Sequence, residues 1–254
     1  MSNKLKDRID SYVNISNYRL MPKLPIIITV NIRNAAKITH LLEKPYDDRF
    51  TETLTATCVR LLQEIDGTVF GYIFNDEIVI IARNDQNIDT SPWLNNYIQK
   101  MVSVVSAIAT THFNTYAKSI GLELVNAIFI SNVYTVPNIT EAINVIISKQ
   151  QQNFQISIQL ACLFELLKKG FNKNDIERLT TNTSVDEKIE LLLDETGVNF
   201  NDYSLKYRRG IACYRMPQVI KIGEEDVIKD KWALNSELPV FTSDKGFLKD
   251  ILKV

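Results

Sequence analysis

Two neighbouring carboxylates, Asp76 and Glu77, lie in a polar turn between two runs of strand-forming residues, 68–74 and 77–82. Carboxylates at such a turn can hold Mg²⁺ beside a triphosphate and neutralise the charge that develops in phosphoryl transfer. A plain polar turn explains the same two residues, and their types and spacing alone favour that simpler interpretation. Their chemistry therefore depends on which side chains the fold places next to them.

Two lysines could bind phosphate. Lys44 precedes a predicted helix at 47–65, and Asp47 has the residue type of an N-cap. A helix N-terminus beside a lysine is a natural phosphate site, although a cap with a solvated lysine is the simpler interpretation. Lys149 lies in a polar run on a later helix, where a solvated face is the alternative.

A third basic group occurs near the end of the chain. Lys206, Arg208 and Arg209 cluster beside Tyr203 and Tyr207. Such a cluster could meet RNA phosphates, and a charged surface hairpin is the alternative.

The spacing of apolar residues predicts the elements that position these groups. The segment 25–32 is β-branched and apolar on both faces, which is typical of a central strand. Ser91 and Pro92 have the residue types that open a helix. The predicted helices are 3–17, 47–65, 92–116 and 139–169, with a helical insert at 172–196; the predicted strands are 25–32, 68–74, 77–82 and 125–136, with short strands near 206–214, 218–222 and 227–232.

The order of these elements is β-α-β-β-α-β. With right-handed crossovers it predicts an α+β fold, the ferredoxin-like unit, in which a four-stranded antiparallel sheet carries two helices on one face. The end of the first strand, at Asn31, then lies beside the hairpin turn, which is where polymerase and cyclase palms bind their metal ions. We expect a palm core at 1–137 and a C-terminal extension of helices and small strands at 138–254, packed as one compact unit.

Composition excludes several classes of protein. The 29 basic and 30 acidic residues give a net charge of −1, which argues against a polybasic coat for nucleic acid but leaves a local basic groove open. Cys58, Cys162 and Cys213 are far apart, so a disulfide framework or zinc finger is not expected and a reducing cytoplasm fits. No segment approaches the roughly 18 apolar residues that span a bilayer, so we expect a soluble protein with no membrane partner. Walker, dinucleotide-binding and GxSxG motifs are absent from the sequence.

Six segments carry a family resemblance, in the same order along the chain. They are LKDRIDSY…LMPKLPIIITV (5–30), EKPYDDRF (43–50), FGYIFNDEIVI (70–80), YIQKMVSVVSAIATTHFN (97–114), KQQQNFQIS (149–157) and GVNFNDYSLKYRRG (197–210). Together they resemble the tRNA(His) guanylyltransferase family, particularly its prokaryotic and viral guanylyltransferase-like branch. The resemblance implies a polymerase-like palm that adds nucleotides to the 5′ end of tRNA in the 3′-to-5′ direction.

The resemblance also implies partners and site residues. It implies Mg²⁺, GTP or ATP as substrate, the 5′ end of tRNA or another RNA, and a homo-oligomer, a dimer or tetramer. Asp76 and Glu77 take the catalytic positions, and Asp76 a metal-binding one. The implied nucleotide-binding residues are Arg33, Lys44, Asp47, Asn75, Lys149 and Ser157, and the RNA-binding cluster is Lys206, Arg208 and Arg209.

Two departures from the family pattern fall on the first metal site. Asn31 stands where the family has its first metal-binding Asp, and a neutral amide is a much poorer Mg²⁺ ligand. Ile32 replaces a Gly and keeps only its backbone carbonyl for the metal. Two hypotheses follow: an active, divergent nucleotidyltransferase with an impaired two-metal site, or an inactive pseudoenzyme that binds a nucleotide, RNA or another protein.

Overall fold

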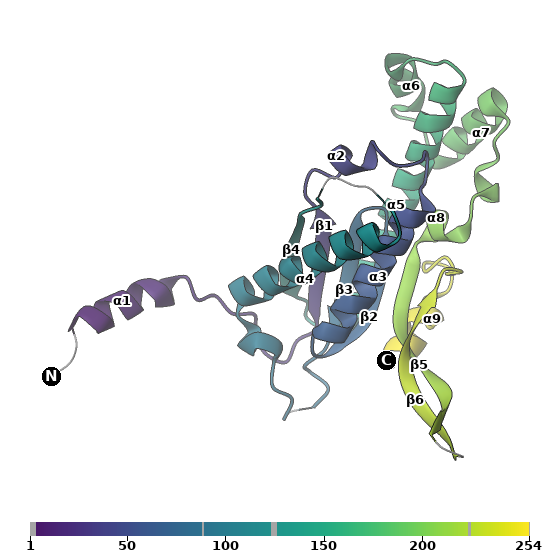
Figure 1. The fold of residues 1–254 in the computed structure, drawn as a ribbon. Helices are drawn as coiled ribbons and strands as arrows, with labels where there is room; N and C mark the ends of the chain where they lie inside the picture. The colour runs from purple at the N-terminus through teal and green to yellow at the C-terminus, as the bar shows by residue number, and fades with distance from the viewer. Residues whose placement is uncertain (1–3, 88, 123–125, 223–224, 254) are drawn as a thin grey trace.

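A computed structural model describes residues 4–87, 89–122, 126–222 and 225–253. Over these residues a six-stranded antiparallel sheet runs through the molecule in the order β4-β1-β3-β2-β5-β6 (Figure 1). The strands are β1 (Ile26–Ile32), β2 (Thr68–Phe74), β3 (Glu77–Ala82), β4 (Phe129–Thr135), β5 (Ile211–Ile222) and β6 (Glu225–Asn235).

The helices lie on both faces of this sheet and beyond its ends (Figure 1). Two 3-10 turns, Trp93–Asn96 and Phe200–Asp202, accompany them. The helices are α1 (Lys4–Ile15), α2 (Ala36–Thr39), α3 (Asp48–Glu64), α4 (Ile98–Ser119), α5 (Ile139–Lys168), α6 (Lys173–Thr180), α7 (Val185–Thr196), α8 (Leu205–Arg209) and α9 (Lys245–Leu252). No helix in the described ranges combines the length and apolar character needed to cross a bilayer.

Successive side chains of the central strands point to opposite faces of the sheet, and this explains why these strands are apolar on both faces. In β1, Ile28 and Val30 belong to the core under α3 and α4, whereas Ile27 belongs to the core on the opposite face. Successive side chains of a strand point to opposite faces, so a strand covered on both sides must be apolar at every position. The opposite face is covered by the first half of α5, by α9 and by Leu238 and Phe241.

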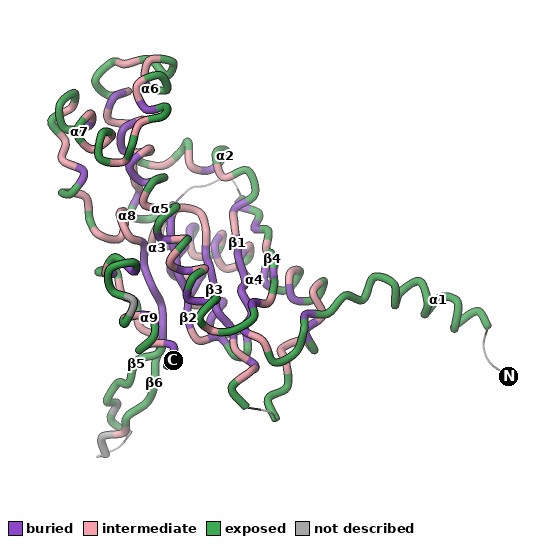
Figure 2. Tube along the Cα trace, turned by 180° about the vertical axis from the view of Figure 1, so that it is seen from behind, coloured by how far each residue is buried: buried purple, intermediate pink, exposed green. Residues whose placement is uncertain are grey.

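The second half of α5 leaves the sheet and forms a separate apolar core with α6 and α7. Ile158, Cys162 and Leu166 of α5 are buried there together with Ile176 and Leu192. Figure 1 shows this helical insert at one end of the molecule and α1 projecting at another. No residue of α1 is buried, as Figure 2 shows by its uniform exposure.

The ferredoxin-like unit predicted from the sequence is confirmed. Its four strands have the order β4-β1-β3-β2, and α3 and α4 lie on one face. β5 pairs with β2, so the C-terminal segment extends the palm sheet itself. This pairing crosses the boundary expected between 1–137 and 138–254.

The C-terminal strands predicted from the sequence overlap observed strands, but their bounds and the breaks between them were wrong. In place of short strands near 206–214, 218–222 and 227–232, a helical turn, α8, precedes one long hairpin of β5 and β6. Pro217 lies within β5, opposite Asp230 of β6. Among the described residues only β6 pairs with β5 beyond Tyr214, so this part of β5 is an edge strand, where proline is tolerated.

The long helix predicted at 92–116 begins later than expected. Leu94 and Asn95 have φ values of 49° and 53°, so the segment after Pro92 forms a short turn, and α4 starts at Ile98. Ser91 and Pro92 therefore open the turn and not the helix. β4 is shorter than the predicted 125–136, and Val125 lies outside the described residues.

The close packing of α3 on β2 leads to a stability prediction. A Cβ added at Gly71 would lie 2.7 Å from Cys58 Sγ and 3.0 Å from Leu62 Cδ1. We expect Gly71→Ala to lower the free energy of unfolding by about 1–3 kcal/mol, because the overpacked helix must move. Chemical denaturation at pH 7 measures this.

Gly246 provides the matched control. It lies in α9, is exposed, and an added Cβ would come no closer than 3.4 Å to a neighbouring atom. We expect Gly246→Ala to be neutral or stabilising by up to about 1 kcal/mol. Equal losses in the two variants would contradict the packing described for Gly71.

Candidate functional site

A cavity of about 300 Å³ opens where four segments meet near one end of the sheet. Its walls come from the loop 43–47 with the first turns of α3, the turn between β2 and β3, α5 and α8. α5 contributes an apolar stripe of Ile156, Leu160 and Phe164, which share a face because they are four residues apart. The volume and the mixed lining are those of a small-molecule site.

Asp76 and Asn75 line the cavity from the hairpin turn. Asn75 has a φ of 49°, a left-handed conformation that asparagine adopts more easily than most residues. Burial raises the pKa of Asp76, and the charge of Glu77 acts in the same direction. No basic side chain in the described part of the chain is ion-paired with Asp76. A partly buried and unpaired carboxylate favours a cationic ligand.

Glu77 has a different environment from Asp76. Its Oε1 and Oε2 accept hydrogen bonds from Lys149 Nζ of α5 at 2.7 and 2.9 Å. Asn31 is the register partner of Glu77, and both lie on the α5 face of the sheet. Glu77, Lys149 and Asn31 do not line the cavity. The structure therefore separates the two carboxylates that the sequence placed together.

The strand end that departs from the family pattern also lies outside the cavity. Ile32 is buried in the core under α3 and α4, and its N–H lies 3.4 Å from the backbone oxygen of Asp76. Arg33 is exposed, and its backbone N–H donates to Ile128 O at 2.7 Å. Neither residue lines the cavity.

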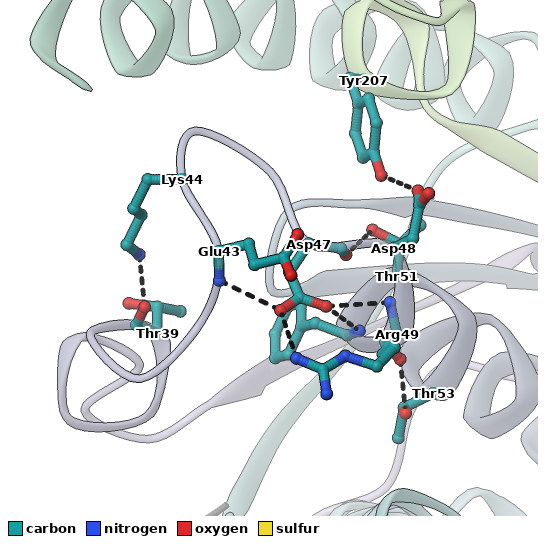
Figure 3. Close-up of polar contacts among 10 residues, drawn as sticks. Thr39, Glu43, Lys44, Asp47, Asp48, Arg49, Thr51, Thr53 and Tyr207 are labelled. Atoms are coloured by element: carbon teal, nitrogen blue, oxygen red, sulfur yellow. Dashed lines mark hydrogen bonds and ion pairs between the residues drawn. The ribbon is translucent and has the colours of Figure 1, made fainter. Parts of the chain in front are cut away.

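Asp47 organises the loop beside the cavity (Figure 3). Its Oδ1 accepts from the backbone N–H groups of Arg49 and Phe50 at 2.9 and 3.1 Å, and its Oδ2 from that of Glu43 at 3.1 Å. Burial alone would raise the pKa of Asp47, but the bonds from Glu43 and Phe50 and the Arg49 guanidinium hold it below its ordinary value. Asp47 is thus the N-cap of α3 and also closes the 43–47 loop.

Lys44 lies at the tip of this loop and lines the cavity. Its Nζ donates to the backbone oxygen of Thr39, as Figure 3 shows. The centroid of the Phe164 ring lies 5.0 Å from the same nitrogen. Burial lowers the pKa of Lys44, and the charge of Asp47 acts in the opposite direction. Because an ammonium group has three N–H donors and only one is used by Thr39, Lys44 keeps donors for an anionic ligand inside the cavity.

α8 brings Lys206 and Tyr207 to the opposite wall. Both donate to Asp48 Oδ1 in the first turn of α3, and Figure 3 shows the tyrosine bond. These two bonds hold the pKa of Asp48 below its ordinary value. The Tyr207 ring stacks on Tyr46 with centroids 4.4 Å apart. The C-terminal segment is thereby attached to the loop that carries Lys44.

Ser157, predicted as a nucleotide-binding residue, is buried under this aromatic pair. Its Oγ donates to the backbone oxygen of Tyr207 and lies 2.6 Å from the hydroxyl of Tyr46. Burial raises the pKa of Tyr46 to about 12, so its hydroxyl stays protonated at neutral pH. Ser157 shapes the wall behind the cavity and does not line it.

Sequence reasoning missed the residues that form the walls. Tyr46 and Tyr207 meet only in the fold, and no sequence signal joins them. The apolar stripe of Ile156, Leu160 and Phe164 could have been found, because its spacing is visible within the predicted helix at 139–169.

The cavity does not fit a resident pair of metal ions. Within the described ranges no group of three or more His, Cys, Asp or Glu could hold a metal ion. Asp47 also lines the cavity, but its carboxylate is occupied by the α3 cap, and Asn31 and Ile32 lie beside the hairpin turn without lining the cavity. A divalent ion at Asp76 would have to arrive with a nucleotide, as part of the substrate.

Comparison with known proteins assigns the family. The family model described as tRNAHis guanylyltransferase matches residues 7–137, more than half of the chain. The chain belongs to this family. Within the family it is similar to "tRNA(His) guanylyltransferase 2" of Arabidopsis thaliana, with 22% identity over 229 residues. That match covers 87% of this chain, which spans only 41% of the length of the relative.

Two further guanylyltransferases extend the comparison. The "Probable tRNA(His) guanylyltransferase" of Drosophila melanogaster is 24% identical over 200 residues, which cover 77% of this chain and 68% of that protein. Among solved structures, a bacterial guanylyltransferase-like protein in complex with ATP matches 97% of this chain and 98% of its own, with a TM-score of 0.82 and 23% identity. The Saccharomyces cerevisiae enzyme matches with a TM-score of 0.71 and 16% identity, over 86% of this chain and 94% of its own.

The cap formed by Asp47 leads to a pH-dependent prediction. Because its pKa is lowered by folding, its contribution is complete above the unfolded pKa of 3.8 and is lost as pH falls through the folded value. We expect Asp47→Ala to cost about 1–2 kcal/mol at pH 7 and less at pH 3. Denaturant unfolding at both pH values measures the difference.

Asn138 is an uncharged control for the same experiment. Its side chain caps α5 by accepting from the N–H of Glu141 at 2.9 Å. The cost of Asn138→Ala should be the same at pH 7 and pH 3. A cost for Asp47→Ala that does not change with pH would show that its carboxylate is not held as described.

Proposed function

We propose that the protein transfers a nucleotidyl group, with ATP or GTP as substrate, to the 5′ end of tRNA or another RNA. The observation that carries this proposal is that Asp76 and Lys44 line the same cavity, which also has an apolar wall on α5. A nucleoside triphosphate needs groups for its charged phosphates and a nonpolar surface for its base, and this cavity offers both.

The residues divide these tasks between them. Lys44 neutralises phosphate oxygens, and Asp76 would hold a Mg²⁺ ion that arrives with the triphosphate. Such an ion would supply positive charge to the phosphates. Asp47 holds the loop of Lys44 in place, and the Tyr46–Tyr207 stack attaches α8 to the same loop. Phosphoryl transfer depends mainly on such positioning and charge, so these contacts are the ones that matter.

The family relationship supports nucleotide addition in the 3′-to-5′ direction. In the resembling family the 3′-hydroxyl of an incoming nucleotide attacks an activated 5′ end of tRNA. The solved structures named above include a complex with ATP. A further structure of a bacterial guanylyltransferase-like protein is in complex with GTP and matches 99% of this chain and 100% of its own, with a TM-score of 0.77 and 22% identity. Either nucleotide therefore remains in the proposal.

Assembly and location are further parts of the proposal. A homo-oligomer, a dimer or tetramer, is supported by α1, whose Leu5, Ile9 and Val13 form an exposed apolar stripe that has no cover in the described chain. A cytoplasmic location is supported by three free cysteines, all buried.

Substitution of Asp76 tests the proposed reaction. We expect Asp76→Asn to lower transfer of labelled GTP or ATP to 5′-truncated tRNA by at least about 100-fold, since removing a group that stabilises transferred charge costs this much. The exposed Asp194 of α7 provides the control, and Asp194→Asn should keep the full rate. Nucleotide binding by the wild type without any transfer would instead identify an inactive member of the family.

Substitution of Lys44 tests nucleotide binding at the same cavity. We expect Lys44→Met to weaken binding of Mg²⁺-ATP about 10- to 100-fold, because a charge-assisted hydrogen bond to phosphate is lost. Isothermal titration measures the affinity. Lys118→Met, at an exposed position near the end of α4, should leave it unchanged. Equal affinities for the Lys44→Met variant and the wild type would place the nucleotide elsewhere.

A further inference from the structure

α8 divides its basic residues between two cavities. Lys206 and Tyr207 line the first cavity, whereas Arg208 and Arg209 line a second one of about 670 Å³. Ser148, Gln151, Gln152 and Gln155 of α5 also line the second cavity, and they lie on a different face of that helix from the apolar stripe of the first. The proposed transfer reaction makes no use of this second cavity.

The two arginines are anchored but keep free donors. Arg208 donates through Nε to Tyr203 O at 2.8 Å and through Nη1 to Asn201 Oδ1 at 3.1 Å. Arg209 donates through Nη1 to Leu238 O at 3.0 Å. A guanidinium has five N–H donors in a planar fork, so each arginine keeps donors for a ligand while its anchored nitrogen fixes its orientation.

Neither arginine is neutralised by a carboxylate. No ion pair to Arg208 or Arg209 occurs within the ranges that the structure describes. Burial and the charge of Arg209 lower the pKa of Arg208, and Asp202 opposes them from beyond ion-pair distance. Two adjacent cations that repel each other and border a cavity favour an anion that binds both.

The rest of the lining suits a nucleoside. The amides of Gln151, Gln152 and Gln155 are exposed and can both donate to and accept from the polar edge of a base. Phe154 and Val185 supply apolar surface beside them. Aromatic side chains and amides together are the groups with which proteins hold unpaired bases.

We propose that this second cavity binds a nucleoside 5′-phosphate unit, with its phosphate on Arg208 and Arg209 and its base against the glutamines of α5. The unit belongs either to a free nucleotide or to the end of an RNA strand, which share this chemistry. The proposal rests on the proposed function only in taking nucleotides and RNA as the natural ligands. Binding at this cavity needs no transfer, so it can be measured separately.

A background variant isolates the second cavity. In Lys44→Met the first cavity has lost its lysine, and we measure the binding of AMP and of a 5′-phosphorylated RNA trinucleotide by isothermal titration. Adding Arg208→Gln should weaken binding about tenfold or more, the usual value of a charge-assisted hydrogen bond. Arg178→Gln, at an exposed arginine of α6 that pairs with Asp175, should change it less than twofold.

A second variant tests the same cavity independently, in case Arg208→Gln does not fold. Gln155 is exposed, and Gln155→Glu places a negative charge in the cavity without removing an anchor. It should also weaken binding about fivefold or more, by repelling the phosphate. Unchanged binding in both variants, or no binding in the Lys44→Met background, would overturn the proposal.

The two ligands identify the source of the nucleotide. Tighter binding of the trinucleotide than of AMP assigns the cavity to an RNA end, and equal or weaker binding assigns it to a free nucleotide. Failure of the proposed transfer reaction has a different signature, because the wild type would then lack transfer while Arg208→Gln still weakened binding in the Lys44→Met background.

Discussion

One buried carboxylate, Asp47, fixes the arrangement on which the cavity depends. It accepts backbone hydrogen bonds from both the loop before it and the first turn of α3 after it, so the loop cannot move independently of the helix. Lys44 lies between those attachments. Because a buried carboxylate without such donors would cost several kcal/mol, the contacts form together or not at all.

The C-terminal segment completes the site that the palm begins. β5 joins the sheet at β2, and the chain immediately before it, α8, therefore lies next to the start of α3. Gly210 makes this possible, since a Cβ there would lie 2.6 Å from the ring of Tyr72. The strand pairing thus determines where Tyr207 meets Tyr46, and the palm alone would leave the cavity open on that side.

Local patterns were enough to predict the palm, because β1, β2 and β3 are short apolar runs and α3 has a clear N-cap. They were not enough for the hairpin of β5 and β6, where Pro217 lies in a part of β5 that pairs only with β6 among the described residues. For the site, the structure places Asp76 and Lys44, which the sequence had singled out, on the lining of one cavity. The sequence could not reveal that Glu77 faces Lys149, because the two residues are 72 positions apart and meet only through the packing of α5 on the sheet.

α5 joins two cores through a single uninterrupted helix of 30 residues. Ile146 is buried against the sheet and Leu166 against the helical insert, while Ile156 faces the first cavity between them. Each residue advances a helix by about 100°, so inserting or deleting one residue between Ile146 and Ile156 would rotate everything beyond it by that angle. The length of this part of α5 is therefore constrained by angular phase, because a shift of one residue would turn the face that packs in the helical insert away from its partners.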